Sequence, residues 1–439
     1  MPCRSIGAQR AQAISSTAAI PVWGKIFSEF PHNLTLIRMH KKIPVSDVRI
    51  GMHIQELCGS WMDHPFWKKS FLLESEKDLI TLQNSSISEV WIDTGLGCDV
   101  EAGSHARYED EVAEDVENEL ARISASTTAK IPLHEELDRA RALLAEGKTA
   151  ITSMFHEVRM GNAIKVSEAE PLVDEISLSI ARNPEAFLNL ARLKNVDDYT
   201  YLHSVAVCGL MIALGKTLGM SGRDLKDAGI AGLMHDVGKA LIPNEVLNKP
   251  GKLTDEEFEV MKGHPRKGWE VLNVAKGANA IALDVCLHHH ERVDGKGYPD
   301  RISGDKLTLF ARMGAVCDVY DALTSNRCYK AGWEPAETIR KMAEWREGHF
   351  DEKVFQAFVK TTGIYPSGSL VRLKSGRLAI VLEQSSKSLL TPVVKVFFST
   401  KSNAPIMPEM LDLSRSQETI VSAEDPTQWG FDLKKIVGI

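Results

Sequence analysis

Residues 288–299 read HHHERVDGKGYP, and the rest of the chain is organised around them. Three histidines and a glutamate stand directly before a loop that contains two glycines. Neutral imidazole is a common ligand of transition metals. Gly295 and Gly297 allow positive φ angles and a close approach of the backbone to a ligand. The stretch therefore predicts a metal cluster that continues directly into a substrate loop.

A second polar stretch lies upstream, where residues 235–239 read HDVGK. Asp236 directly follows His235, and a carboxylate in that place is suited to bridge two metal ions. Lys239 comes three residues later and is placed to reach a phosphate. Together the two stretches predict a metal-dependent phosphohydrolase.

The chain around these stretches has a helical pattern from residue 133 to residue 365. Short loops between the predicted helices imply that helices adjacent in sequence are neighbours in space. We expect an all-α catalytic domain over 133–365. Its predicted helices span residues 133–160, 166–182, 184–193, 197–219, 222–233, 254–273, 278–292, 306–326, 335–347 and 351–359.

The flanking segments have different patterns. Alternating strands near 41–54 and 86–94, with a helix between them, predict a small α+β domain over 39–104. Residues 105–132 are expected to form an acidic helix, at 105–121, and a linker. Residues 366–439 predict a β-rich appendage: a hairpin turning at Ser375-Gly376, a third strand at 391–400 and an irregular tail. Residues 1–38 lack the unbroken apolar core of a signal peptide; we expect a poorly ordered extension, with Met39 as an alternative start.

Composition narrows the classes of partner and compartment. The 439 residues carry a net charge of −7, which argues against binding of long nucleic acid but leaves a small anionic ligand open. The seven cysteines show no paired spacing, so we expect a reduced, cytoplasmic protein without a disulfide framework. No run approaches the roughly 18 apolar residues of a membrane span. A homodimer or a signalling-protein partner is left open.

Candidate ligands recur at intervals of about one helix and its loop. The gaps between successive positions run from 25 residues (264 to 289) to 32 residues (203 to 235). Antiparallel helices would then each present a ligand at the same depth. Separate core or capping histidines would explain any one of these residues but explain the set poorly. The set is His203, His235, Asp236, His264, His289, His290 and Asp318.

Three other histidines have no clustered partners in the sequence. We expect His134, His156 and His349 to lie at the surface.

Several motifs together resemble the HD-GYP branch of the HD-domain phosphohydrolases. They are HDVGK, HPRKG and HHERVDGKGYP, followed by FARMGAVCDVYDALTSNRCYK. The resemblance covers about 195–365, and residues 41–100 resemble a small uncharacterised domain often found ahead of this catalytic domain in bacteria. The family hydrolyses cyclic di-GMP at a centre of two or three divalent ions, iron or manganese, with nickel, cobalt or magnesium also open. A water or hydroxide between the ions attacks phosphorus in line.

The resemblance also implies roles for individual residues. One ion is held by His203, His235, Asp236 and Asp318. The other is held by Asp236, His264, His289 and His290, so that Asp236 bridges. Lys239 binds a phosphate oxygen, and Asp236 and Lys239 are the expected catalytic residues. The remaining expected substrate contacts are Arg327, Lys330, Tyr298, Asp294 and Gly295, with Asp294 and Glu291 favoured for orienting the loop and the ligands.

The register of the three consecutive histidines needs a choice. Side chains one residue apart on a helix differ by about 100°, so the three cannot all face one point. The family pattern has two histidines directly before the glutamate, which selects His289 and His290. His288 is then expected to be packed or exposed away from the ions.

One position departs from the family pattern. Members with three ions carry a glutamate four residues before the first histidine, on the same helix face. Here that position is Tyr199, and tyrosine is neutral near pH 7. The sequence therefore predicts two metal ions per chain.

The leading expectation is an enzyme that hydrolyses cyclic di-GMP to linear pGpG, with further hydrolysis to GMP left open. The sequence leaves two alternatives open. One is hydrolysis of the hybrid 3'3'-cyclic GMP-AMP. The other is a non-catalytic sensor that binds the dinucleotide and signals through a protein partner.

Overall fold

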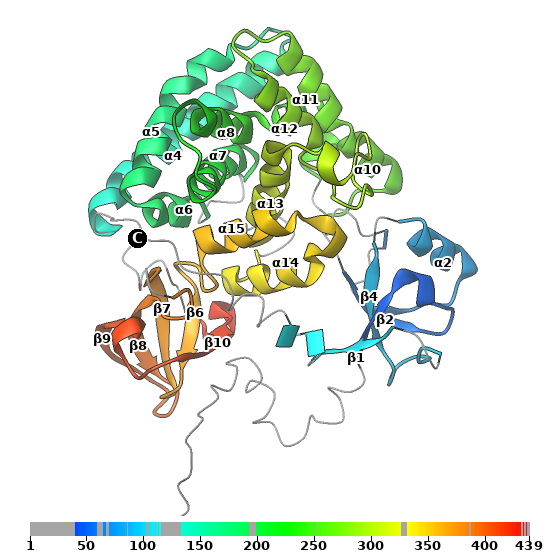
Figure 1. Cartoon of the computed structure of the whole chain (residues 1–439), viewed down its shortest axis with the longest axis vertical. Coiled ribbons are helices and arrows are strands. Elements are labelled where there is room, and N and C mark those ends of the chain that lie inside the picture. Colours follow the sequence, from blue (N-terminus) through cyan, green and yellow to red (C-terminus); the bar gives the residue numbers. More distant parts are fainter. Residues whose placement is uncertain are drawn as a thin grey trace, which may run out of the picture.

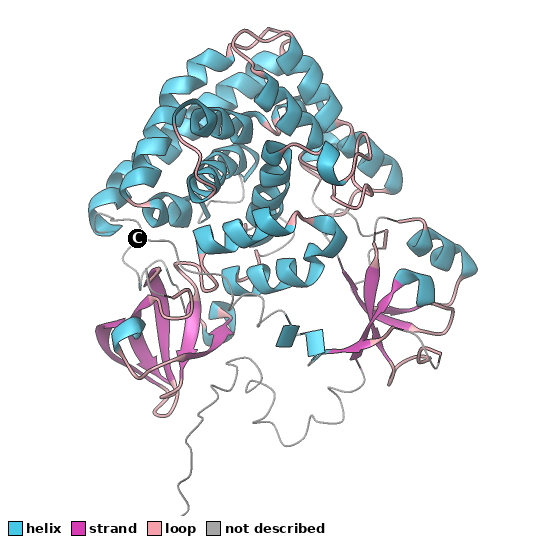
Figure 2. Cartoon of the chain, viewed as in Figure 1, coloured by secondary structure: helices cyan, strands magenta, loops and turns pink. Residues whose placement is uncertain are grey.

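The computed structural model describes most of the chain from residue 40 onward. Two small β-domains flank a helical domain, as Figures 1 and 2 show. The described residues are 40–58, 65–66, 70–85, 87–101, 105–109, 111–112, 114–115, 133–192, 199–249, 251–325, 332–385, 388–431, 433 and 436. The predicted extension at 1–38 lies outside them.

The N-terminal domain is a five-stranded sheet with one helix. Its strands are β1 (His40–Pro44), β2 (His53–Cys58), β3 (Phe71–Leu72), β4 (Glu89–Asp93) and β5 (Arg107–Tyr108), in the order β3-β2-β4-β1-β5. Helix α2 (Glu76–Gln83) lies between β3 and β4 in sequence. The predicted α+β character is confirmed. The predicted helix at 105–121 is wrong at its start, because β5 pairs with β1 there.

Helices form the middle of the chain. Their bounds are α4 (Leu133–Arg159), α5 (Glu170–Arg182), α6 (Pro184–Arg192), α7 (Tyr199–Thr217), α8 (Gly222–Met234), α9 (Asn244–Leu247), α10 (Asp255–Lys262), α11 (His264–Asn273), α12 (Ala280–His288), α13 (Leu309–Thr324), α14 (Pro335–His349) and α15 (Glu352–Thr362). Short 3-10 turns η3 (Val166–Ala169), η5 (Val237–Leu241) and η6 (Gly304–Lys306) join some of them. The predicted mainly α fold class is confirmed.

Helix α7 is the centre of this domain. It is apolar on every side, with Val205, Met211 and Leu214 fully buried, and it packs against α4, α8 and α13. A helix that is hydrophobic all round belongs inside a protein. Neighbouring helices can therefore present ligands toward one another around α7.

One predicted helix is divided in two. The sequence pattern predicted a single helix over 254–273, but α10 ends at Lys262 and α11 begins at His264. Thr254 and Glu257 form a capping box that starts α10. Pro265 stands in the first turn of α11, where its missing N–H costs no helix hydrogen bond. The break places His264 at the beginning of a helix.

The C-terminal domain is an antiparallel sheet in the order β10-β6-β7-β8-β9. Its strands are β6 (Leu370–Leu373), β7 (Arg377–Glu383), β8 (Val393–Ser399), β9 (Ala404–Asp412) and β10 (Ile420–Glu424), with η7 (Leu413–Arg415) and α16 (Pro426–Trp429) between and after them. The predicted hairpin and third strand are confirmed. The predicted irregular tail is wrong, because residues 404–424 add two strands.

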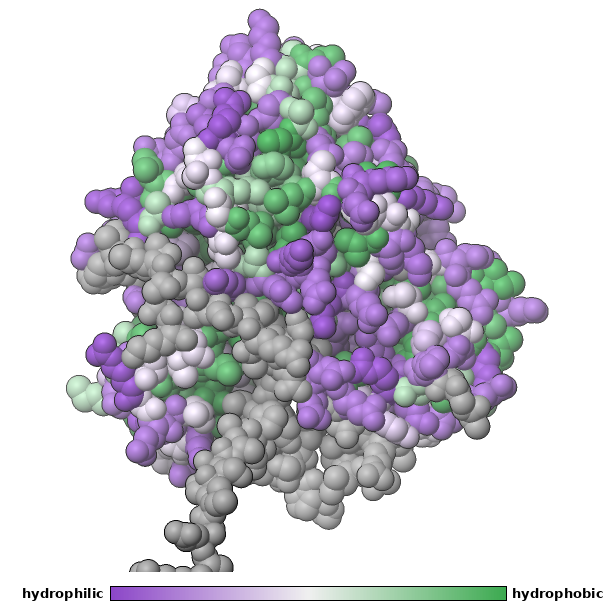
Figure 3. All heavy atoms as spheres, viewed as in Figure 1, coloured by the Kyte–Doolittle hydropathy of each residue, from purple (hydrophilic) through white to green (hydrophobic). Residues whose placement is uncertain are grey.

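The three parts share apolar packing. One connected core joins the helices to Cys58 and Trp91 of the N-terminal domain and to Val371 and Val381 of the C-terminal sheet. Hydrophilic side chains cover much of the face in Figure 3, while hydrophobic ones gather near the middle of the helical domain. Among the described residues, no helix combines the length and the apolar character that crossing a membrane requires.

Candidate metal centre

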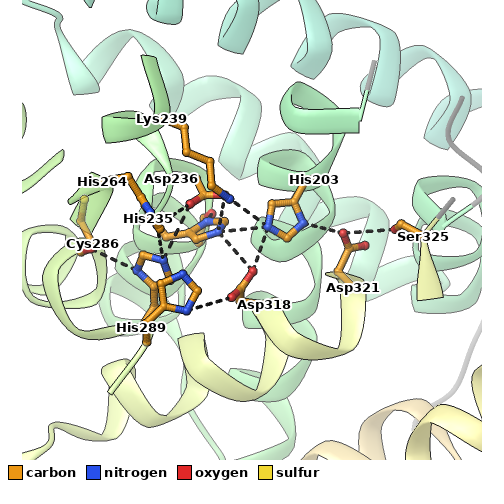
Figure 4. Close-up of polar contacts among 12 residues, drawn as sticks. His203, His235, Asp236, Lys239, His264, Cys286, His289, Asp318, Asp321 and Ser325 are labelled. Atoms are coloured by element: carbon orange, nitrogen blue, oxygen red, sulfur yellow. Dashed lines mark hydrogen bonds and ion pairs between the residues drawn. The ribbon is translucent and has the colours of Figure 1, made fainter. Parts of the chain in front are cut away.

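Seven predicted ligands converge inside the helical domain, as Figure 4 shows for six of them by label. They come from helices, helix ends and one turn: α7, the end of α8, the start of η5 and of α11, the end of α12, and α13. Every one of them is buried. The seven are His203, His235, Asp236, His264, His289, His290 and Asp318.

The ligands form two groups. Ring nitrogens of His264, His289 and His290 lie within 4.8 Å of one another. Nitrogens of His203 and His235 and an oxygen of Asp236 form a second group within the same limit. These groups match the division between two ions that the resemblance implied.

The histidines are oriented for metal binding by their outer nitrogens. His235 Nδ1 lies 2.7 Å from the Gly232 carbonyl, and His264 Nδ1 lies 2.8 Å from the Met261 carbonyl. A carbonyl can only accept, so each Nδ1 carries the proton and donates it. The Nε2 lone pairs then face inward. Hydrogen bonds of this kind fix the tautomer of metal-ligating histidines.

The inward nitrogens approach one another more closely than two unlinked acceptors would. His203 Nε2 and His235 Nε2 are 3.3 Å apart, and so are His264 Nε2 and His289 Nε2. The outer nitrogen of His289, Nδ1, also faces a backbone carbonyl, as it does in His235 and His264. It lies 3.0 Å from the Val285 carbonyl oxygen. Two lone pairs at such a distance are stabilised by a cation that both contact.

Asp236 spans the two groups with its two oxygens. Oδ2 is 3.3 Å from Nε2 of both His203 and His235. Oδ1 is 3.2 Å from His264 Nε2 and 3.7 Å from His289 Nε2. A carboxylate with one oxygen toward each group is placed to bridge two ions.

Asp318 also faces both groups, although the resemblance assigned it to one ion. Its Oδ1 is 2.9 Å from His203 Nε2, and its Oδ2 is 3.6 Å from His290 Nδ1. Among the described residues, Asp236 Oδ1, Asp318 Oδ2 and His290 Nε2 are buried without a hydrogen bond. Buried polar atoms need a partner, and a divalent cation in each group fits this donor set.

The charges of the centre suit cations as well. Burial raises the pKa of Asp236, but Lys239 and His235 outweigh burial and hold it well below its usual value. Burial, with His235 and His264 nearby, lowers the pKa of His289 to about 3. Burial also lowers the pKa of His264 and of His290. At pH 7 the three-histidine group is therefore neutral, which is the state that binds metal.

In the other group, formed by His203, His235 and Asp236, the histidine pKa shifts in the opposite direction. Burial lowers the pKa of His235, but Asp236 and Asp318 outweigh it and raise it to about 10. Both carboxylates stay ionised in this environment, because the pKa of Asp318 also lies well below its usual value. A cation bound there would take the place of protons on the histidines.

Lys239 lies at the edge of the centre. It is on η5, and its Nζ is 2.5 Å from Asp236 Oδ2. Its side chain is 18% exposed, whereas Asp236 is fully buried. A cation in this position can meet a substrate phosphate that approaches from solvent.

The loop after the histidines is held by its own side chains. Asp294 accepts from Arg292 at 2.9 and 3.1 Å and from the Lys296 backbone N–H at 3.0 Å. Glu291 accepts from the backbone N–H groups of Asp300 and Arg301. Both carboxylates thus orient the loop, as the sequence favoured.

Tyr298 joins this loop to a ligand. Its ring stacks on His290 with centroids 4.7 Å apart. Gly295 has a φ of +73° and turns the chain within the same loop. His288 points elsewhere, with Nδ1 2.7 Å from Asp284, so the predicted register is supported. Arg327 and Lys330 lie outside the described residues.

Sequence reasoning missed Asp321. This buried residue lies one turn after Asp318 on α13, and its Oδ2 is 2.6 Å from His203 Nδ1. It gives His203 the outer acceptor that backbone carbonyls give His235, His264 and His289. The sequence does contain a signal for this contact. Asp318 and Asp321 are three residues apart, so they share one face of a helix.

The predicted surface position of His349 is wrong. His349 is buried, and its carbonyl accepts from the Val293 backbone N–H. His156 is exposed as predicted, and nothing is described for the side chain of His134.

Comparison with known proteins finds two family models in the chain, and the first of them extends through α4 into the helical domain. A family model described as a domain of unknown function, DUF3391, matches residues 40–169, and the HD domain model matches residues 176–354. A cyclic di-GMP phosphodiesterase of Pseudomonas aeruginosa is 51% identical over 396 residues, covering 90% of this chain and 94% of that protein.

Two further relatives align over shorter stretches. The cyclic di-GMP phosphodiesterase response regulator RpfG of Xanthomonas campestris is 34% identical over 46% of this chain and 57% of that protein. The 3'3'-cGAMP-specific phosphodiesterase 2 of Vibrio cholerae is 37% identical over 29% of this chain and 24% of that protein.

The fold and the site define an HD-domain protein with a DUF3391 domain ahead of it. With its HHERVDGKGYP stretch and its relatives, the chain belongs to the HD-GYP branch of that family.

Proposed function

We propose that this protein is a metal-dependent phosphodiesterase that hydrolyses cyclic di-GMP to linear pGpG, with the further step to GMP left open. The observation that carries the proposal is Asp236, whose two oxygens each face one of two histidine groups. The relative that is 51% identical is named a cyclic di-GMP phosphodiesterase. Enzymes that cleave phosphate esters commonly use two neighbouring ions in this arrangement.

The expected centre holds two divalent ions, with iron or manganese favoured by the mixed histidine and carboxylate donors. His203, His235, Asp236 and Asp318 would hold one, and His264, His289 and His290 would hold the other with Asp236 shared. Bound ions of this kind acidify water and stabilise the attacking and leaving oxygens of a phosphodiester.

The chain's own residues would bind and orient the substrate. Lys239 lies beside the buried Asp236, is itself partly exposed to solvent, and is proposed to contact a phosphate oxygen. Tyr298, Asp294 and Gly295 are proposed to shape the guanine end of the pocket, with Tyr298 fixed by its stacking on His290. Arg327 and Lys330 are proposed to contact the dinucleotide.

A second substrate, 3'3'-cyclic GMP-AMP, is favoured by one observation. The Vibrio cholerae relative specific for that dinucleotide aligns with this chain at 37% identity. A non-catalytic sensor remains the alternative from another class. The full set of seven ligands favours catalysis over it.

The test is a hydrolysis panel on the purified protein. The protein is incubated with Mn²⁺ and either cyclic di-GMP or 3'3'-cyclic GMP-AMP, and linear products and mononucleotides are separated and quantified. We expect pGpG from cyclic di-GMP. Binding of the dinucleotide without any linear product would overturn the enzyme proposal in favour of the sensor.

Matched variants divide the roles. Asp236→Ala should lose metal and hydrolysis together, because it removes the shared carboxylate. Lys239→Ala and Arg327→Ala should keep the metal and lose activity. Lys262→Ala is the control, since Lys262 pairs with Glu259 on α10. Full metal content and normal turnover in Asp236→Ala would contradict the two-ion centre.

A further inference from the structure

Helix α14 (Pro335–His349) connects the N-terminal domain to the loop that follows the metal ligands. Figure 1 shows it in yellow, between the helical bundle and the two β-domains. One part of α14 contacts the N-terminal sheet, and its last residues contact the loop. Both contacts include hydrogen bonds.

The N-terminal domain is tied to α14 by two lysines. Lys341 Nζ, on α14, donates to Glu56 Oε2 of β2 at 2.8 Å. Lys42 Nζ, on β1, donates to the Glu344 carbonyl at 3.1 Å and pairs with Glu89 at 2.6 Å. Lys42 is 5% exposed. The Lys341 side chain is 15% exposed and that of Glu56 is 34% exposed. Charges that are partly shielded from water are screened less than surface charges, and these contacts join the domain to the helix.

The environment of Lys341 keeps the pair charged. Burial lowers the pKa of Lys341, but Glu344 and Glu56 outweigh burial and raise it above its usual value. Glu344 itself pairs with Arg340 at 2.5 Å. The Lys341–Glu56 pair is therefore the direct charged link between β2 and α14.

The far end of α14 holds the loop backbone. The helix departs from helical geometry at Glu347 and Gly348, where Gly348 has a φ of +77°. The Gly348 carbonyl accepts from the Asp294 N–H at 3.0 Å, and the His349 carbonyl accepts from the Val293 N–H at 3.3 Å. A Cβ at Gly348 would lie 3.1 Å from the Asp294 carboxylate. The loop and this kink are thus fitted closely together.

From there the loop leads directly to a ligand. The Tyr298 backbone N–H donates to the His290 carbonyl at 3.2 Å, and its ring stacks on His290. A Cβ at Gly297 would collide with the backbone of His290 and Glu291. The loop that contains Asp294 therefore also contacts His290, a member of the three-histidine group.

We infer that Lys341 and Glu56 are positioning residues through which the N-terminal domain holds the substrate loop, residues 293–298, in place. The regular part of α14 extends from Lys341 to Arg346, five positions or about 7.5 Å of helix, and the kink at Glu347 and Gly348 follows directly. A rigid helix carries a displacement from one end to the other. When the N-terminal domain holds α14 in place, the carbonyls of Gly348 and His349 hold residues 293–298 against His290. Loosening of the Lys341–Glu56 pair releases the loop, weakens substrate binding and leaves the metal ligands unchanged.

The test is a charge exchange in the full-length protein. Lys341→Glu and Glu56→Lys are made singly and together, with Glu56→Gln as a milder variant that keeps the side-chain shape. Each single variant should increase hydrogen exchange of the backbone N–H groups in 292–298. Each should also raise KM about threefold to tenfold, with kcat and metal content retained. Effects of about this size are typical of residues that connect two coupled sites. The double variant should restore both readouts in part, because Lys341 also pairs with Glu344 at 3.4 Å and a carboxylate in its place is repelled there.

The control is Arg49→Glu. Arg49 pairs with Glu101 within the N-terminal domain, and that pair is exposed. The Arg49→Glu variant should lower the stability of the protein slightly and leave the hydrogen exchange of residues 292–298 as in the wild type. Exchange in 292–298 that is unchanged in the single variants, or that the double variant fails to restore, would overturn the inference.

The activity readout rests on the proposed function, but hydrogen exchange does not. If the wild type hydrolyses neither dinucleotide, the proposed function fails. The exchange results on the loop then still decide the role of Lys341 and Glu56.

Discussion

At the scale of single residues, the centre depends on acceptors that lie outside the ligands. His235, His264 and His289 each donate an outer N–H to a backbone carbonyl, but His203 donates to a side chain, Asp321. A carbonyl acceptor cannot be removed by substitution, whereas Asp321 can. It therefore offers a way to disturb one ligand without deleting it.

Asp321→Asn should weaken metal binding about 10-fold to 100-fold, which is the usual cost of losing such an outer partner. The amide keeps the shape but no longer holds the His203 tautomer with a carboxylate. Equilibrium titration with Mn²⁺ measures the Kd. Asp227→Asn is the control, since Asp227 is a buried carboxylate that pairs with Arg223 instead of a histidine. Equal Kd values for the two variants would contradict the role of Asp321.

Tyr199→Glu should add an ion to the centre. Position 199 is the first residue of α7 and stands one turn before His203. A carboxylate there supplies the ligand that two-ion members of the family lack. Metal analysis and anomalous scattering at saturating Mn²⁺ should give two ions in the wild type and three in the variant. Three fully occupied positions in the wild type would show that the two-ion prediction is wrong.

At the scale of elements, glycines allow the ligand-bearing segments to approach. Gly238 on η5 faces α11, where an added Cβ would collide with the His264 carbonyl and with Gly268. Gly268 in turn faces Cys286 of α12. The segments that carry Asp236 and His264 are therefore in backbone contact, and α11 packs on the Cys286 side chain of the helix that leads to His289 and His290.

Gly238→Ala should separate η5 from α11 and move Asp236 away from His264. Overpacking of this kind typically costs about 1–3 kcal/mol, and metal content should fall with stability. Thermal unfolding and metal analysis measure the two effects. Gly263→Ala serves as the control, because its Cβ would meet the Val260 carbonyl at 3.1 Å and the flexible Lys267 side chain at 3.9 Å, with no closer contact. A Gly238→Ala protein with wild-type metal content would rule out this packing argument.

At the scale of the whole molecule, the ligands lie inside a core that the three parts of the chain share. Helices, the N-terminal sheet and the C-terminal sheet all contribute to one apolar cluster. The fold around the centre is therefore formed by burial of apolar residues, and bound ions add stability to it.

Removal of metal by a chelator should lower Tm while leaving the protein folded. An ion present at 100 times its Kd stabilises a folded protein by about 2.7 kcal/mol. Differential scanning calorimetry before chelation, after it and after return of Mn²⁺ measures the change. Asp236→Asn should show almost no response to either treatment. A Tm that stays constant through chelation in the wild type would contradict a bound ion in this core.

The sequence by itself determined the class of fold and brought out the candidate ligands. Helical periodicity over 133–365, the strand patterns at both ends and the regular spacing of His203 to Asp318 are local signals, and a helix or hairpin forms from local preferences. Helix geometry alone showed that His288, His289 and His290 cannot all face one point, and the family pattern then selected His289 and His290.

Only the tertiary structure decided which atoms meet. The bridging by both oxygens of Asp236, the second span by Asp318 and the outer contact of Asp321 depend on α7, α11, α12 and α13 packing at particular distances. The two added strands at 404–424 depend on pairing with β8 and β6. The burial of His349 depends on a loop 56 residues earlier in the chain, at Val293. Contacts between distant segments come from packing, and a pattern in one segment does not contain them.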